Sequence, residues 1–179
     1  AGVELSLTVV VSNLGLIRAE GNVSLLGRNV TNAGSIESEN GYVFLLGAEQ
    51  ASLDRWDALT DDFLAHKDFF GLLAEGSVQN SGSIQARNAA LLGGRVANHG
   101  EIQVDDGSVL IVAADAVYVS EFVNPVLIRL AHLDARANGN PNDADGETEY
   151  AIENHGRIDA GLGHVRLAAS DPLGFGIRQ

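Results

Sequence analysis

Short segments of alternating apolar and polar residues recur along this chain around one phrase, Asn-x-Gly-x-Ile. A Val or Ile stands two residues before each Asn, and a small or β-branched residue stands two positions after each Ile. This alternation with period two is typical of β-strands that bury one face. The phrase contributes Asn13, Asn32, Asn80, Asn98, Asn154, Gly15, Gly34, Gly82, Gly100 and Gly156.

A second apolar segment follows a Gly-containing turn in most copies. These segments are residues 21–27, 41–47, 107–113 and 163–169. Successive Asn residues are separated by about nineteen positions where no insertion intervenes, and a unit of that size cannot bury its inner face alone. Neighbouring units must therefore stack. The sequence predicts an all-β fold, a parallel β-helix or solenoid, as a single domain over residues 1–179.

The repeated Asn and Gly residues have a backbone explanation. Asn tolerates the left-handed region and Gly adopts positive φ without penalty, so both suit a sharp turn between two strands. Equivalent Asn side chains on successive coils can also form a hydrogen-bonded amide ladder. We interpret the ten residues as a structural turn ladder, in preference to ligands for a sugar or a cation.

The first of two insertions spans residues 51–76. Its apolar residues have helix-like intervals, and Ser52 and Thr60 are suitable N-caps, so we expect a short helix or two. We interpret the aromatic residues as a cover for one flank of the β-helix, with a contact surface as the alternative. The residues at helical intervals are Leu53, Trp56, Leu59, Phe63 and Phe70.

The second insertion spans residues 115–150 and has a different pattern. Alternating apolar residues predict further strands around 117–119 and 126–130, with Asn124-Pro125 as a turn. A polar loop over 134–149 follows. Its Asp-x-Asp-Gly segment resembles part of a calcium loop, but the EF-hand spacing would place Pro141 at the first ligand position and Ile152 at the twelfth. Calcium binding by residues 138–149 stays open as a hypothesis.

Composition narrows the classes of partner. The net charge is −13, from 24 acidic and 11 basic residues, which disfavours nucleic acid as a partner. There is no Cys, which suits an exported chain. The chain starts Ala1-Gly2 without an initiator Met, so we expect a fragment of a longer protein. Gly is enriched at 21 residues, and much of it is periodic.

The sequence points to no catalytic, cofactor or metal site. The outward columns beside the repeated Ile do not gather carboxylates, and the five His residues lack the spacing of metal ligands. An active site would have to come from an insertion. The columns are Arg18, Glu37, Gln85, Gln103 and Asp159, then Leu16, Ser35, Ser83, Glu101 and Arg157; the His residues are His66, His99, His132, His155 and His164.

Residues 21–38, running on to 41–49, resemble the secretion domain of filamentous haemagglutinin-like proteins, the exoproteins of bacterial two-partner secretion. Residues 109–130 and 152–160 resemble the way that domain continues. The resemblance implies a right-handed β-helix in a secreted or cell-surface bacterial protein, exported through an outer-membrane transporter barrel. No functional residue is carried over.

The sequence and the resemblance together favour a non-enzymatic, extracellular structural or adhesin-like domain. Its expected partners are surface glycans or proteins of host or neighbouring cells. Two alternatives remain. One is a carbohydrate-active β-helix, a polysaccharide lyase or hydrolase, with its site in an insertion. The other is a self-assembling filament subunit whose bare β-helix ends associate end to end.

Overall fold

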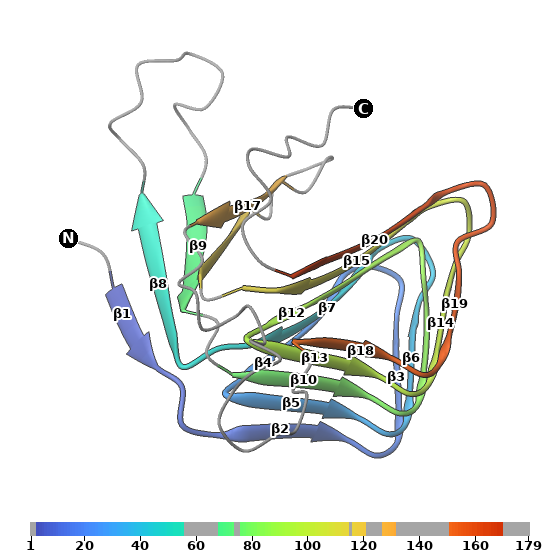
Figure 1. Cartoon of the computed structure of the whole chain (residues 1–179), viewed down its shortest axis with the longest axis horizontal. Coiled ribbons are helices and arrows are strands. Elements are labelled where there is room, and N and C mark those ends of the chain that lie inside the picture. Colours follow the sequence, from blue (N-terminus) through green and yellow to red (C-terminus); the bar gives the residue numbers. More distant parts are fainter. Residues whose placement is uncertain are drawn as a thin grey trace, which may run out of the picture.

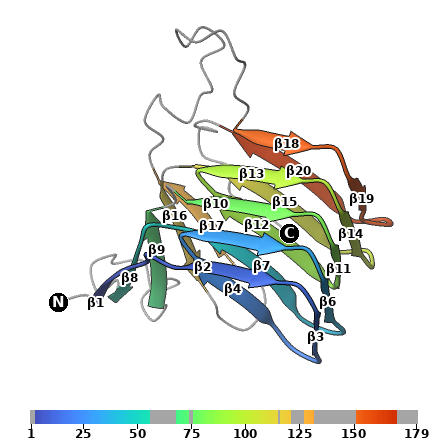
Figure 2. The same cartoon turned by 90° about the horizontal axis from the view of Figure 1, so that it is seen from below.

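The residues that the structure describes form a parallel β-helix of five coils, with three strands in each coil (Figure 1). The computed structural model describes residues 3–55, 68–73, 76–114, 116–120, 127–131 and 151–169. Followed from one coil to the next, the chain winds in a right-handed sense (Figures 1 and 2). The predicted all-β solenoid is confirmed.

Each side of the β-helix is a five-stranded parallel sheet. The first sheet contains β2 (Val10–Asn13), β5 (Asn29–Asn32), β10 (Ser77–Asn80), β13 (Arg95–Asn98) and β18 (Ile152–Asn154). The second sheet contains β3 (Leu16–Ala19), β6 (Ser35–Ser38), β11 (Ser83–Ala86), β14 (Glu101–Val104) and β19 (Arg157–Asp159). The third sheet contains β4 (Val23–Gly27), β7 (Tyr42–Gly47), β12 (Asn88–Gly93), β15 (Ser108–Ala113) and β20 (His164–Ala169). We number the coils 1 to 5 in this order.

The strands stack so that equivalent residues of the repeat pair with one another. Val78 pairs with Val30 on one side and with Val96 on the other, and Ile84 pairs in the same way with Ile36 and Ile102. Because side chains alternate along a strand, this register sends columns of apolar side chains from all three sheets into the interior. The largest interior side chains are fully buried: Val30, Ile36, Val43, Leu45, Val78, Ile84, Leu91, Val96, Ile102 and Ile111.

A fourth, antiparallel sheet lies beside the β-helix. It has the order β1 (Val3–Ser6), β8 (Gln50–Arg55), β9 (Asp68–Leu73), β16 (Ala116–Ser120) and β17 (Leu127–Ala131). β8 and β9 come from the insertion after coil 2, whereas β16 and β17 come from the insertion after coil 4. The two insertions therefore meet, at the β9–β16 pairing.

The prediction of a helix in residues 51–76 is wrong for the part that the structure describes. Residues 50–55 and 68–73 are strands that pair with each other, and residues 56–67, with Trp56, Leu59 and Phe63, lie outside the described residues. Ala51 and Leu53 also fit the period of a strand, and Phe69-Phe70 favours one. A short apolar segment can fit both the period of a helix and the period of a strand, and here pairing with distant strands selects the strand.

The strands expected in the second insertion are confirmed. β16 and β17 form an antiparallel pair, with Val117 opposite Leu130 and Val119 opposite Ile128. Asn124-Pro125 and the loop of residues 134–149 lie outside the described residues.

The three middle strands of the third sheet, β7, β12 and β15, are covered on both faces, whereas β20 is mostly exposed. The outward side chains of this sheet form a second apolar cluster, separate from the cluster that fills the interior of the β-helix. Leu7, which follows β1, packs against this cluster, whose buried members include Ala48 and Ala114 at the points where the insertions leave the β-helix. Five outward side chains of β7, β12 and β15 are at most 9% exposed: Phe44, Leu46, Ala90, Leu92 and Val112.

Candidate functional site

The repeated Asn side chains form one continuous ladder along the β-helix. Asn13 donates from Nδ2 to Oδ1 of Asn32 at 2.8 Å, and Asn32 donates to Asn80 at 2.8 Å. Asn80 donates to Asn98 at 2.7 Å, and Asn98 donates to Asn154 at 2.8 Å. Every rung has the same donor-to-acceptor direction, so the ladder has a polarity that runs from coil 1 to coil 5.

The ladder is buried for most of its length. Asn32, Asn80 and Asn98 have no exposed surface, whereas Asn154 in coil 5 is exposed. The second N–H of an amide also finds a carbonyl, as in the bond from Asn32 Nδ2 to Ser83 O at 3.3 Å. Buried amides that bond in this way avoid the cost of an unpaired polar group. The ladder therefore holds adjacent coils in register.

Four of the five glycines of the repeat, all except Gly15, are required by close approach between coils. A Cβ atom at Gly82 would lie 1.9 Å from Gly34 O in the preceding coil, and one at Gly100 would lie 2.0 Å from Gly82 O. Positive φ, the reason expected from the sequence, is wrong for this column: among the described residues only Asp106 and Gly161 have it. The turn needs a residue without a side chain, because the carbonyl oxygen of the preceding coil occupies the space that a Cβ atom would need.

The two positive-φ residues lie in the turns that lead from the second sheet to the third in coils 4 and 5. Asp106 has φ of 55°, and its Oδ1 accepts a hydrogen bond from the backbone N–H of Leu162 at 2.8 Å. Gly161 also has φ of 55° and lies directly against the Asp106 carboxylate. Asp106 thus has a local structural role.

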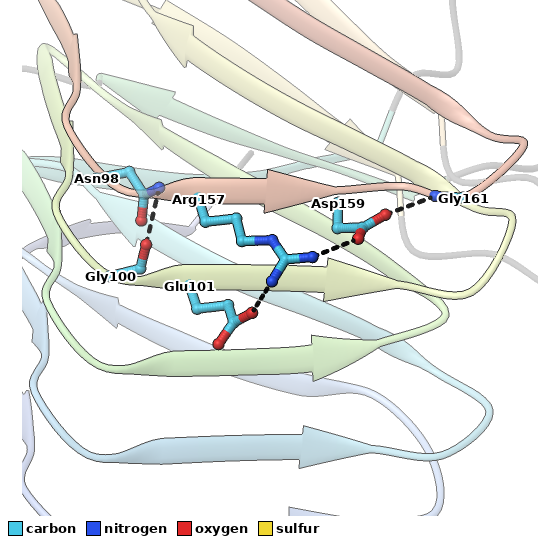
Figure 3. A network of polar contacts seen from close by, with 6 residues as sticks. All are labelled: Asn98, Gly100, Glu101, Arg157, Asp159 and Gly161. Atoms are coloured by element: carbon cyan, nitrogen blue, oxygen red, sulfur yellow. Dashed lines mark hydrogen bonds and ion pairs between the residues drawn. The ribbon is translucent and has the colours of Figure 1, made fainter.

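Charged side chains on the outer face of the second sheet pair across coils. Arg18 in coil 1 contacts Glu37 in coil 2 at 2.7 Å. In coil 5, Arg157 contacts Glu101 of coil 4 at 3.5 Å and Asp159 of its own strand at 3.0 Å (Figure 3). These side chains are one-third to two-thirds exposed, so each pair contributes little to stability.

Two of these charged groups have a shifted pKa. The pKa of Asp159 is lowered, first by the hydrogen bond from the Gly161 backbone N–H and then by the Arg157 guanidinium. The pKa of Arg18 is raised by its hydrogen bond to Glu37 and by the charge of that carboxylate. Both shifts favour the ionised forms, which suits ion pairs and not proton transfer at neutral pH.

His99 and His155 occupy one repeat position in coils 4 and 5. Their rings stack with centroids 5.3 Å apart and planes 1° from parallel, and both side chains are exposed. His155 Nε2 lies 3.6 Å from a carboxylate oxygen of Glu153. The part of the chain that the structure describes contains no group of three or more His, Asp or Glu side chains arranged to hold a metal ion.

Several candidate residues lie outside the described residues. They are His66, His132 and residues 138–149, the segment of the calcium hypothesis. His164 in coil 5 is exposed.

Two surface features were missed at the sequence level. The buried outer face of the third sheet could have been found from unbroken apolar runs such as residues 43–46, since strands covered on both faces lose alternation. The second feature is an apolar outer corner on coil 1, formed by Val10, Leu14 and Leu16, which are 58–79% exposed. In later coils these positions hold polar or small residues, for example His99 and Glu101 in coil 4.

Comparisons with family models, curated proteins and solved structures found no match to this chain. Among the described residues, no helix has the length and apolar character needed to cross a membrane.

Proposed function

We propose that this chain is a non-enzymatic, extracellular β-helical domain of the filamentous haemagglutinin type, which serves as a structural scaffold or an adhesin. The observation that carries the proposal is the use of the repeated polar residues. The Asn amides, the most regular polar groups in the sequence, bond to one another inside the coils. They maintain the shape of a shaft and leave recognition to its outer faces.

The outer face of the second sheet is suited to contact with a surface. Its strands are in register, so their outward side chains form straight rows separated by the strand spacing of about 4.8 Å. Gln85 and Gln103 are adjacent in one row and are exposed. Amide side chains in such rows can donate and accept hydrogen bonds to the hydroxyl groups of a glycan or to a protein backbone.

Export through an outer-membrane transporter barrel agrees with two properties of the chain. It contains no Cys, so folding outside the cell needs no disulfide formation. Each coil of a solenoid contacts only its neighbours, so coils can fold successively as the chain emerges. Localisation outside the cell, on a bacterial surface or in the medium, is part of the proposal.

The test uses the purified chain in two assays. Beads coated with it should adhere to cells or immobilised glycans, and a variant with Gln85→Ala and Gln103→Ala should adhere less. Gln79→Ala is the matched control, because Gln79 is exposed on the first sheet. Circular dichroism would verify that the variants fold.

The second assay incubates the chain with soluble polysaccharides and measures new reducing ends and unsaturated sugars. We expect neither to form. Cleavage of any polysaccharide would overturn the non-enzymatic assignment and favour the lyase or hydrolase alternative. Equal adherence of the wild type and uncoated beads would overturn the adhesin role and leave a scaffold.

A further inference from the structure

The first and the last coil that the structure describes each have strands with one unpaired edge. Among the described residues, no strand pairs with the outer edges of β2, β3 and β4 in coil 1, or of β18, β19 and β20 in coil 5. The two ends appear at the bottom and the top of Figure 2. At coil 5 the interior side chains of β20 are also open to solvent, with Val165 46% and Leu167 45% exposed. Edges of this kind are templates for pairing with another chain.

Coil 1 contains a glycine that its own surroundings do not require. Four glycines of the turn column, Gly34, Gly82, Gly100 and Gly156, would each place a Cβ atom within about 2.0 Å of the preceding coil's carbonyl oxygen. Gly15, the fifth, has nothing within 4 Å of that position. No described atom near Gly15 requires a glycine, whereas a further coil stacked below coil 1 would require one.

The open ends are complementary along the Asn ladder. Asn154 is the last residue of the ladder and donates to no acceptor among the described residues, whereas Asn13 at the other end accepts only from the Gly15 backbone N–H. If coil 5 of one copy lies below coil 1 of a second copy, Asn154 can donate to Asn13 of that copy. This hydrogen bond has the same donor-to-acceptor direction as the four rungs within one copy. A head-to-head contact would reverse the polarity.

The side-chain columns match in the same register. Ile158 would lie below Ile17 and Leu167 below Leu25, so apolar interior residues would continue without a break. On the outer face of the second sheet, Asp159 would lie below Arg18, which places opposite charges in adjacent coils.

The apolar outer corner of coil 1 would also be partly covered at this junction. Leu14 occupies the same repeat position as His155, so it would cover the free face of the imidazole that stacks on His99 at 5.3 Å. Burial of exposed apolar surface of this kind favours association.

We propose that this chain associates with a second copy of itself end to end, with coil 5 of one copy stacked below coil 1 of the next in the register of its own coils. The contact extends the three parallel sheets and the Asn ladder across the junction. It rests on the β-helix fold and is independent of adhesion, so either proposal can fail alone.

The first experiment measures the mass of the purified chain by sedimentation over a range of protein concentrations. We expect the mass to rise with concentration, and to rise further with salt, because each copy has a net charge of −13 and salt screens the repulsion. Gly15→Ala should abolish the rise and leave the melting temperature of the monomer nearly unchanged. A chain that stays monomeric at the highest concentration and salt overturns the proposal.

The second experiment fixes the register with cysteines, which the natural chain lacks. Ser12 and Glu153 lie in one outward column of the first sheet, four strand spacings apart, which is about 19 Å within one copy. Across the proposed junction they would be adjacent, within the range of a disulfide. Oxidation of a variant with Ser12→Cys and Glu153→Cys should therefore give a ladder of multimers.

The control combines Ser12→Cys with His164→Cys, which is in coil 5 but on the third sheet, and should give only the background of cross-linked dimers. Ser12→Cys alone measures that background. Equal multimer yields for the two pairs, or a strong dimer from Ser12→Cys alone, would show a different contact and overturn the proposal.

Discussion

The α-carbon of Gly82 lies so close to the carbonyl oxygen of Gly34 that a Cβ atom there would be 1.9 Å from that oxygen. The oxygen is not free to move away, because it accepts a hydrogen bond from the Ser83 backbone N–H at 3.0 Å. The glycine column is thus a requirement of the spacing between coils.

Gly82→Ala should destabilise the protein by at least about 2 kcal/mol, which corresponds to a melting temperature lower by roughly 4–8 °C. Gly15→Ala is the matched control. At low protein concentration it should change stability by less than about 1 kcal/mol, since its surroundings are open. Thermal unfolding followed by circular dichroism measures both, and equal losses would show that the turn itself needs glycine.

Asn98→Leu should lower stability by about 2–4 kcal/mol. The substitution leaves Asn80 without its acceptor and Asn154 without its donor, and an unpaired buried polar group costs about 1–3 kcal/mol. Asn154→Leu should cost less, because Asn154 is exposed and water can replace the lost rung. Urea unfolding of the two variants measures the difference, and an unchanged midpoint for Asn98→Leu would contradict a stabilising ladder.

Leu92→Ala should cost about 2–5 kcal/mol, the range for a leucine in a packed core, because its outward side chain is only 1% exposed. Leu14→Ala provides the contrast at 79% exposure and should change stability by less than about 0.5 kcal/mol. Similar midpoints for the two variants in urea would contradict a second core on the outer face of the third sheet.

The pKa of Asp159 is below its ordinary value in the folded protein, so this group stabilises the fold above the unfolded pKa of about 3.9. That contribution is lost as the pH falls through the lower, folded pKa. Asp159→Asn should therefore reduce the loss of stability between pH 5 and the acid limit of folding, measured by urea unfolding at each pH.

An NMR titration of the Asp159 carboxyl separates the causes of its shift. In an Arg157→Gln variant the pKa should rise only part of the way to its ordinary value, because the Gly161 backbone N–H is the larger cause. Full return to the ordinary value would show that the guanidinium dominates.

The β-helix could be predicted because its repeat constrains the same residue types at the same positions. Five copies of Asn-x-Gly-x-Ile align the columns that the strands then pair, such as Val78 with Val30 and Val96. Alternation with period two assigned the inward face correctly at Ile36, Ile84 and Ile102. A pattern repeated along the chain carries information about long-range pairing that one segment lacks.

The insertions lacked that information. Residues 51–76 occur once, so helix and strand periods competed without a second copy to decide between them. The role of the glycines was also hidden, because close approach from a neighbouring coil and positive φ both select glycine. The distance from Gly82 to the Gly34 carbonyl separates the two causes, and no sequence pattern contains that distance.

The β9–β16 pairing has a mechanical consequence. A simple stack can unzip from either end, one coil at a time. Here β9 also pairs with β8, and the hydrogen bonds between β9 and β16 close a loop of chain that contains coils 3 and 4, residues 77–113. Coils 3 and 4 therefore cannot separate from the rest of the β-helix while β9 and β16 stay paired. Tension along the shaft would fray coils 1 and 5 first, and amide exchange should be slowest in the coils between the two insertions.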